Sequence, residues 1–154
     1  MLLACLLALL VPAVVSAQAS ASSGNIAIKV WSEGNLKYVT FNVLLHSPTA
    51  TAAPGVSVMF SDCKAGLGLP VGPEPVWSSH NAGALQANKI GDIQWDVDSL
   101  PAIGSGPLMV RLRYALPRHS VPYSVCLKAS FVQLSTGYRW SANMRFFLKP
   151  AKPI

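Results

Sequence analysis

The residues of this chain whose types and spacing could do chemistry are few, and two cysteines come first. The 154 residues contain Cys63, Cys126 and one further cysteine, Cys5, which lies in an apolar N-terminal stretch. If the chain is exported to an oxidising compartment, the even number of thiols beyond that stretch favours one Cys63–Cys126 disulfide. Two separate buried thiols are the alternative. In the chain-entropy description, a disulfide that closes so long a loop stabilises the fold by ~4 kcal/mol.

Motifs for catalysis are absent from the sequence. General acid–base catalysis needs titratable groups that converge in a cleft, and the chain has only six acidic residues and three histidines, which are scattered. Gly104-Ser105-Gly106 lacks the spacing of a nucleophile elbow, and no phosphate-binding loop occurs. No histidine lies close to Cys126 in sequence, as a copper site would need. The sequence therefore predicts a non-catalytic protein that uses no cofactor and binds no metal ion.

Arg111 and Arg113 are the charged pair with the most suggestive spacing, because side chains two apart on a strand point to the same face. Residues 1–98 hold four basic and six acidic side chains, whereas residues 99–154 hold eight basic and no acidic ones. If the strands of that second part share a sheet, one of its faces is strongly electropositive. We expect Arg111, Arg113 and Arg118 to contact an acidic or membrane-protein partner, or an anionic polysaccharide. The secretory leader argues against nucleic acid, and a solvated basic surface without a partner is the alternative.

Three acidic side chains alternate along another expected strand. Asp92, Asp96 and Asp98 face one way, and carboxylates so spaced could bind Ca²⁺ or pair with Arg111 and Arg113 across strands. Alternating acids are also what the solvated side of a half-buried strand carries. We adopt this simpler interpretation.

Exposed tryptophans are candidate platforms for sugar rings. Trp31 is out of phase with the apolar residues of its strand, and Trp77 lies in an irregular segment, so we expect both at the surface. They would form the binding site if the ligand is a carbohydrate. Trp140 shares its phase with Met144 and Phe146, which predicts a place in the core.

Residues 64–79 form the most irregular segment, with six glycines and prolines within ten residues. Because proline lacks the N–H that a ladder needs and glycine weakens a strand, we expect a long loop. Its apolar residues exceed what a solvated loop requires: Leu67, Leu69, Val76 and Trp77. The loop is predicted to bind the partner, and a flap folded over one end of the core is the alternative.

The N-terminus is typical of a secretory leader. Residues 1–19 contain an apolar run without a charged side chain, which is broken by Pro12 and ends in small residues. The run is shorter than the ~20 residues of a spanning helix, so we expect cleavage after Ala17 or Ala19 rather than an uncleaved anchor. No later stretch is long and apolar enough to span a bilayer. The predicted product is a single extracellular domain of residues 20–154, secreted or held peripherally at the plasma membrane or cell wall.

Period-two alternation recurs along the chain and predicts an all-β fold. Apolar residues alternate in seven stretches: residues 25–32, 37–45, 56–60, 92–98, 108–116, 123–134 and 138–148. Residues 82–89 could form at most two helical turns. Short strands at this spacing predict an antiparallel immunoglobulin-like or fibronectin-III-like β-sandwich of seven to eight strands, with a closed barrel as the alternative. Cys63 is out of phase with Val56, Val58 and Phe60, which argues against the inter-sheet disulfide of an antibody domain.

Four short segments carry a resemblance to known families. They are Val56-Ser57-Val58 before Cys63, Trp77, Trp95-Asp96-Val97 before Leu100-Pro101, and Val110-Arg111-Leu112-Arg113-Tyr114-Ala115-Leu116. In this pattern the chain resembles the nitrate-transporter accessory (activating) proteins of plants and algae, with one residue inserted in the last segment. That resemblance implies a small secretory-pathway sandwich that supports a high-affinity nitrate carrier at the plasma membrane. The stretch from Trp95 to Pro101 is also similar to the N-terminal sandwich module of fungal cell-wall glucan-assembly proteins.

The chain departs from the accessory proteins in three places. Ser78 and Ser79 stand where that family has a basic cluster directly after the tryptophan, and Cys126 does not sit where its second cysteine would. Residues 145–154 are basic and contain proline, where that family has a C-terminal membrane helix. The two resemblances point to the same fold and to different functions.

The sequence thus predicts a non-catalytic extracellular interaction module. Its contact surface would combine Arg111, Arg113 and Arg118 with the loop of residues 67–77. The most concrete version, which follows from the first resemblance, is an accessory subunit of a nitrate-type transporter at the plasma membrane. A cell-wall or carbohydrate-binding protein and a secreted effector of a host-associated microbe are the alternatives.

Overall fold

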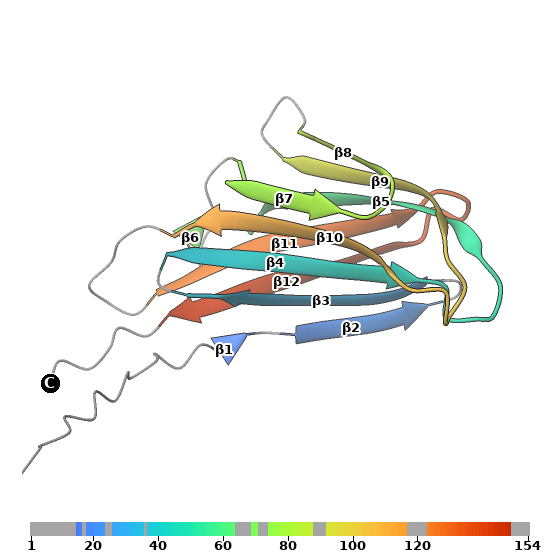
Figure 1. Cartoon of the computed structure of the whole chain (residues 1–154), viewed down its shortest axis with the longest axis horizontal. Coiled ribbons are helices and arrows are strands. Elements are labelled where there is room, and N and C mark those ends of the chain that lie inside the picture. Colours follow the sequence, from blue (N-terminus) through green and yellow to red (C-terminus); the bar gives the residue numbers. More distant parts are fainter. Residues whose placement is uncertain are drawn as a thin grey trace, which may run out of the picture.

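Two stacked β-sheets hold all the regular structure in the part of the chain that is described (Figure 1). The computed structural model describes residues 15–16, 18–23, 26–35, 37–63, 69–70, 74–87, 92–116 and 123–148. Sheet A contains β1 (Val15–Ser16), β5 (Ala53–Asp62), β6 (Leu69–Pro70), β8 (Ala84–Ala87), β9 (Ile93–Leu100), β11 (Tyr123–Gln133) and β12 (Arg139–Leu148). Sheet B contains β2 (Gln18–Ser23), β3 (Ile26–Gly34), β4 (Tyr38–His46), β7 (Trp77–His80) and β10 (Leu108–Ala115).

Strands that are distant in sequence lie side by side in both sheets. Sheet A has the order β1-β12-β11-β5-β9-β8, with β6 paired to β11, and sheet B has the order β2-β3-β4-β10-β7. Among the described strands, every pairing except that of β6 is antiparallel. β10 lies between β4 and β7 in sheet B, while its sequence neighbours β9 and β11 belong to sheet A. The predicted antiparallel β-sandwich is confirmed.

The described part of the chain contains more strands than the seven to eight that alternation predicts. The seven expected strands correspond to β3, β4, β5, β9, β10, β11 and β12, and the additional ones are short and lie at sheet edges or beside β11. β7 forms within the segment expected to be a loop. The helical turns that residues 82–89 allow are not formed, because Ala84–Ala87 pairs with β9 as an edge strand. Pairing with a neighbour overrides the weak helical preference of so short a segment.

The core lies between the two sheets and is built by the alternating residues of the longer strands. Its large, fully buried side chains include Ile26, Phe41, Leu45 and Leu112 from sheet B, and Phe60, Trp95, Leu127, Phe131, Met144 and Phe146 from sheet A. The buried hydroxyl of Ser32 donates a 2.8 Å hydrogen bond to the carbonyl oxygen of Arg145 and so ties β3 to β12. Trp140 packs against this core, as its phase predicts, with its ring centroid 5.1 Å from that of Phe131.

The predicted Cys63–Cys126 disulfide is present. Cys63 directly follows β5, and the register of β5 with β11 places Asp62 opposite Leu127, so the two cysteines form the next opposed pair. Their Cα atoms are 5.6 Å apart, and Cys126 is fully buried. The bond therefore joins neighbouring strands of sheet A, unlike the inter-sheet bridge of an antibody domain. This place agrees with the out-of-phase position of Cys63.

Part of the predicted leader pairs with the sandwich. Val15–Ser16 forms β1 beside β12, and Gln18–Ser23 forms β2 beside β3. Cleavage after Ala17 would leave β2 whole, whereas cleavage after Ala19 would shorten it by its first two residues. Either cut would remove β1 and expose the edge of β12. The leader itself stays a prediction.

Burial of Tyr114 gives the fold a predicted sensitivity to alkaline pH. Burial raises the pKa of the Tyr114 hydroxyl above its ordinary value, and the negative charges of Asp62 and Asp92 act in the same direction. The unfolded chain loses this proton near the ordinary tyrosine pKa of about 10, whereas the folded chain retains it, so this contribution to stability is present below that pH and lost above it. We expect the free energy of unfolding to fall by about 1.4 kcal/mol for each pH unit above ~10.

Urea denaturation at about pH 9 and about pH 11 measures this loss. The Tyr114→Phe variant should lack it, whereas Tyr138→Phe, a change at an exposed side chain, should retain it. An equal decline in the wild-type protein and the Tyr114→Phe variant would contradict the assignment.

Candidate binding site

The outer face of sheet B consists of the side chains that alternate with its core residues. Its described members are Ala27, Lys29, Trp31 and Glu33 on β3, Tyr38, Thr40, Asn42, Leu44 and His46 on β4, Met109, Arg111, Arg113 and Ala115 on β10, and Trp77 and Ser79 on β7. The strand register aligns these residues in rows across the sheet. Trp31, Asn42, Arg111 and Ser79 form one row, and Glu33, Thr40, Arg113 and Trp77 form the next. Arginines and tryptophans from distant parts of the sequence therefore share one surface.

Both arginines are held flat against this face by side chains of the neighbouring strand β4. Arg111 Nε donates a 3.0 Å hydrogen bond to Asn42 Oδ1, and Arg113 Nε donates a 3.1 Å hydrogen bond to Thr40 Oγ1. Asn42 and Thr40 are only 1% and 4% exposed although they point outward, so the arginines lie over them. Each guanidinium group is fixed through its Nε, which orients its two terminal nitrogens.

Trp77 lies beside both guanidinium groups. β7 pairs with β10 so that Trp77 is opposite Arg113. The Cζ atoms of Arg111 and Arg113 are 5.8 Å and 5.0 Å from the Trp77 ring centroid, within the range of a cation–π contact. The indole is 41% exposed. The face therefore presents an aromatic surface next to two cations.

Trp31 lies on the same face, on the far side of Arg111 from Trp77. It is opposite Asn42 in the register and is half-buried. Lys29 Nζ is 5.5 Å from its ring centroid. Arg111, Arg113 and Trp77, which were expected to bind a protein partner, thus share one surface with Trp31, which was expected to bind a carbohydrate.

The structure does not place all of the predicted contact residues on this face. Leu69 belongs to β6, which pairs with β11 in sheet A, and Leu67 and Arg118 lie outside the described residues. Val76 precedes β7, and its N–H donates a 2.7 Å hydrogen bond to the carbonyl oxygen of Arg113. Its side chain is exposed. The segment predicted as one binding loop therefore divides between the sheets, and among its described residues only the end at Val76 and Trp77 contacts the arginines.

The described basic residues of the second half lie in both sheets, so the condition under which one strongly electropositive face was expected is not met. Arg111 and Arg113 lie on β10 in sheet B, whereas Lys128, Arg139 and Arg145 lie on β11 and β12 in sheet A. The remaining three lie outside the described residues: Arg118, Lys149 and Lys152. The sandwich separates these charges because successive strands enter different sheets.

The acidic residues of β9 do not meet the arginines either. Asp96 accepts hydrogen bonds from the Ser57 hydroxyl and, at 2.8 and 3.0 Å, from Gln94 Nε2, all within sheet A. Because β9 and β10 belong to different sheets, Asp96 and Asp98 do not pair with Arg111 and Arg113 across neighbouring strands. Among the described residues of the outer face of sheet B, the one ion pair joins Arg111 to Glu33, with Nη2 and Oε1 3.1 Å apart.

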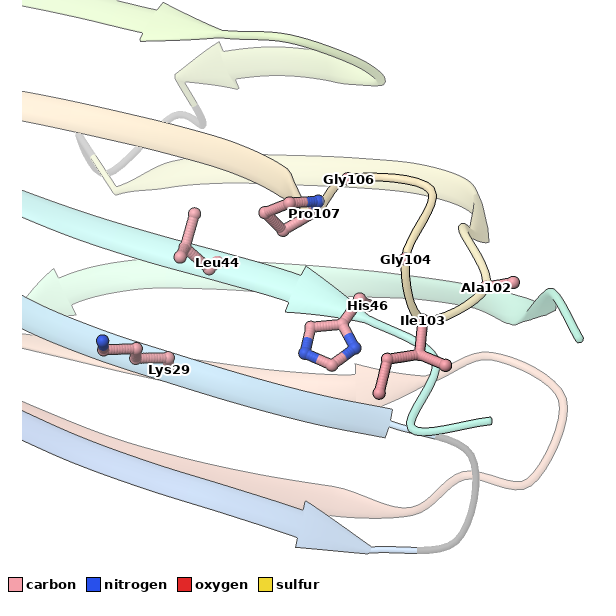
Figure 2. Close-up of a pocket in the computed structure, with 8 residues that line it drawn as sticks. All are labelled: Lys29, Leu44, His46, Ala102, Ile103, Gly104, Gly106 and Pro107. Carbon is pink, nitrogen blue, oxygen red and sulfur yellow. The ribbon is translucent and has the colours of Figure 1, made fainter. Parts of the chain in front are cut away.

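One end of the outer face of sheet B opens into a cleft of about 380 Å³ (Figure 2). Lys29, Leu44 and His46 contribute from the sheet, and the β9–β10 connection contributes Ala102, Ile103, Gly104, Gly106 and Pro107. Because a carbonyl oxygen can only accept, the 2.7 Å contact between His46 Nδ1 and the oxygen of Ser47 places a proton on Nδ1. Nε2 is then left for a ligand.

Sequence reasoning missed this cleft because residues 99–107 were expected to be only a turn. Gly104 and Gly106 have φ values of 89° and 86°, which only glycine adopts readily, and the N–H of Ile103 donates a 2.8 Å hydrogen bond to the carbonyl oxygen of Thr49. These features fold the connection beside β4. The signal in the sequence was Ile103, a large apolar residue directly before Gly104 in a turn.

Within the described ranges, no group of three or more His, Cys, Asp or Glu side chains is placed to hold a metal ion. A helix long and apolar enough to cross a membrane is not found among the described residues.

No family model matches the sequence, and no curated protein matches it in sequence. Among solved structures, AvmM, described as catalysing macrocyclization in alchivemycin A biosynthesis, aligns with a TM-score of 0.40 and 9% sequence identity, over 84% of this chain and 92% of that chain. A likeness of this degree does not establish a shared activity.

Proposed function

We propose that this protein is a non-catalytic, secreted interaction module that binds an acidic partner through the outer face of sheet B. The observation that carries the proposal is the pair Arg111 and Arg113, anchored through Nε on Asn42 and Thr40 and stacked against Trp77. A guanidinium group held in this way offers its terminal nitrogens to a carboxylate in a fixed orientation.

Preorganisation is the physical reason why this pair suits binding. An arginine that is free in solution loses side-chain entropy when it binds, whereas Arg111 and Arg113 are already held in the unbound protein. Glu33 pairs with Arg111 at 3.1 Å and is itself more than half exposed, so a carboxylate already fits this place and can be exchanged. An exposed pair of this kind contributes little to stability, which leaves the arginines available for a partner.

Secretion is supported by two features of different kinds. The Cys63–Cys126 disulfide persists in oxidising compartments and is rare in the cytosol. Residues 1–19 have the composition of a secretory leader. In the version suggested by the resemblance to nitrate-transporter accessory proteins, the partner is an acidic extracellular segment of a plasma-membrane carrier.

A cell-wall or other carbohydrate-binding function is the second candidate. Trp31 and Trp77, the two tryptophans expected to stack on sugar rings, lie on the face that carries the arginines. This observation favours a ligand that offers both negative charge and flat apolar surfaces.

Reversing both charges is expected to abolish partner binding. Arg111→Glu/Arg113→Glu replaces attraction by repulsion, and we expect the retained amount of any specific partner to fall at least about tenfold, since like charges in contact cost several kcal/mol. Tagged protein is incubated with the extracellular and membrane fractions of its source, and the retained partners are quantified by mass spectrometry.

The matched control is Arg139→Glu/Arg145→Glu, which changes the net charge equally on sheet A. It should retain the partners. Because the first variant also leaves the buried Asn42 and Thr40 without their donors, thermal denaturation must show that it is folded at the temperature of the assay, and Arg111→Gln/Arg113→Gln provides a milder version. Equal retention by the two charge-reversed proteins would refute the proposal.

A further inference from the structure

The basic side chains on the outer face of sheet B follow one another along the strands, one in each of four consecutive rows. The register pairs Ala27 with His46, Lys29 with Leu44, Trp31 with Asn42, and Glu33 with Thr40. Arg111 and Arg113 on β10 join the Asn42 and Thr40 rows. His46 on β4, Lys29 on β3, and Arg111 and Arg113 on β10 thus occupy successive rows along β4, and we call this set the basic track.

The spacing of this track follows from strand geometry. Successive rows on one face are two residues apart, so the rise of ~3.4 Å per residue gives a step of about 7 Å and about 20 Å from His46 to Arg113. Each arginine row also contains a tryptophan: Trp31 shares the row of Arg111, with Asn42 between them, and Trp77 lies next to Arg113. The track therefore carries the cations Lys29, Arg111 and Arg113 in successive rows, with His46 at one end and indole rings in the two arginine rows.

We infer that the basic track binds a linear carboxylated polysaccharide, a chain of uronic acid units laid along β4. The inference rests on the proposed function and deepens it by naming the chemical class of the acidic partner. Each uronic acid ring carries one carboxylate and has a flat apolar side. It can therefore offer a negative charge to a basic row and a surface to an indole.

An acidic peptide fits this place less well than a polysaccharide. Extended peptides bind sheets by adding to an edge strand, where unpaired backbone groups are available. The track runs over β3, β4 and β10, each of which has a paired strand on both sides. A ligand on this face must bind through its own charges and rings, because no backbone ladder is open to it.

A carboxylate suits the track because the protein already places one there. Glu33 Oε1 lies 3.1 Å from Arg111 Nη2, and its side chain is 54% exposed. A ligand carboxylate can take the place of Glu33 without any movement of Arg111, whose Nε stays on Asn42. In the complex, we therefore expect a ligand carboxylate to contact Arg111 with the geometry that Glu33 has in the free protein.

The cleft next to His46 gives the track a defined end. Leu44, Ile103 and Pro107 supply its apolar surface, the stem of Lys29 lines it, and His46 Nε2 is left for a hydrogen bond (Figure 2). Figure 2 shows the ammonium end of Lys29 directed away from His46, and that ammonium lies over Trp31. The terminal sugar ring of a bound chain would occupy the cleft, and its neighbour would meet Lys29.

Single-stranded nucleic acid also combines regular charge with rings that stack on aromatic side chains. The disulfide indicates an oxidising compartment outside the cytosol. This compartment favours the polysaccharide as the ligand. A single-stranded oligonucleotide is therefore tested as a competing ligand.

Length dependence is the decisive test. Oligogalacturonides of increasing length are titrated into the purified protein by calorimetry at low and moderate salt. We expect no measurable binding of the monomer, an affinity that rises until the oligomer spans the rows from Lys29 to Arg113, and a plateau beyond that length. Fully methyl-esterified oligomers of the same length, which keep the rings and lack the charge, should bind at least about tenfold more weakly, because the charge-assisted hydrogen bonds to the arginines are lost.

Single substitutions show where the polysaccharide binds on the protein. Lys29→Ala, Arg111→Gln and Arg113→Gln should each weaken binding about threefold to tenfold, the range for one exposed charged contact. If the terminal sugar of the polysaccharide occupies the cleft, only long oligomers reach Trp77. Trp77→Ala should then weaken the binding of long oligomers more than that of short ones. Arg139→Gln on sheet A is the matched control and should leave the affinity unchanged.

The outcomes separate this inference from the proposed function. If heparin, a single-stranded oligonucleotide or polyglutamate binds more tightly than polygalacturonate of similar length, the carboxylated polysaccharide is the wrong ligand. If no oligogalacturonide binds while Arg111→Glu/Arg113→Glu still abolishes retention of a protein partner, the inference fails and the proposed function stands. If oligogalacturonides bind equally to that variant, the basic track is not their site, and the inference is overturned.

Discussion

Replacing Trp95 with alanine is expected to lower the free energy of unfolding by about 4 kcal/mol, since truncating a buried Phe or Trp costs ~3–5 kcal/mol. Trp95 is fully buried in the centre of β9 and is among the largest side chains of the core. Its indole N–H donates a 2.8 Å hydrogen bond to the carbonyl oxygen of Ala82. The variant therefore loses apolar contacts, leaves a cavity and deprives a carbonyl group of its donor. The midpoint and slope of urea denaturation, monitored by circular dichroism, give the change.

Two further substitutions separate these contributions. Trp95→Phe keeps most of the ring and removes the N–H, so we expect a smaller loss of about 1–2 kcal/mol from the lost hydrogen bond and a small void. Trp140→Ala, at a half-buried position on the margin of the core, should cost less than Trp95→Ala. A Trp95→Ala protein as stable as Trp140→Ala would show that Trp95 does not occupy the centre of the core.

Trp95 also illustrates why the sandwich could be predicted from sequence. Ile93, Trp95 and Val97 alternate with Gln94, Asp96 and Asp98, and the structure buries the first set and leaves the second toward solvent. Alternation of this kind records a local property, the two sides of a pleated strand, so a single segment reveals it. The same logic found the position of Cys63 outside the inward phase of β5.

Short edge strands were not predictable by that logic. β7 and β8 have four residues each, and none of their residues is fully buried. Neither strand has a clean apolar side, because an edge strand covers the core from one margin only. Their existence depends on the free edges of β10 and β9, which are properties of the assembled sheets rather than of the segments themselves.

The binding face was predictable in its residue types and not in its arrangement. Arg111 and Arg113 could be paired from their spacing on one strand, and Trp77 could be placed at the surface. No local pattern, however, indicates that β10 lies between β4 and β7. The contacts of the arginines with Thr40 and Asn42 could therefore not be predicted from the sequence. The separation of β10 from β11 into different sheets, which divides the basic residues, depends on the same long-range pairing.

Removing the disulfide is expected to lower the free energy of unfolding by about 4 kcal/mol in the chain-entropy description. The sequence separation of Cys63 and Cys126 is 63 residues. Breaking the bond releases that whole loop in the unfolded chain, whereas the folded strands remain paired. We propose Cys63→Ala/Cys126→Ala rather than serine, because Cys126 is fully buried and a hydroxyl there would need a partner. Urea denaturation of the variant and of the wild-type protein gives the difference.

Reduction supplies the control for this change. Dithiothreitol should lower the stability of the wild-type protein toward that of the double variant and should leave the double variant unaffected. Because the bond lies in sheet A and the arginines lie in sheet B, the folded double variant should bind its ligand with unchanged affinity at a temperature well below its melting point. A loss of less than about 1 kcal/mol would mean that the bond adds little constraint to the unfolded chain and does not act through the loop that it closes.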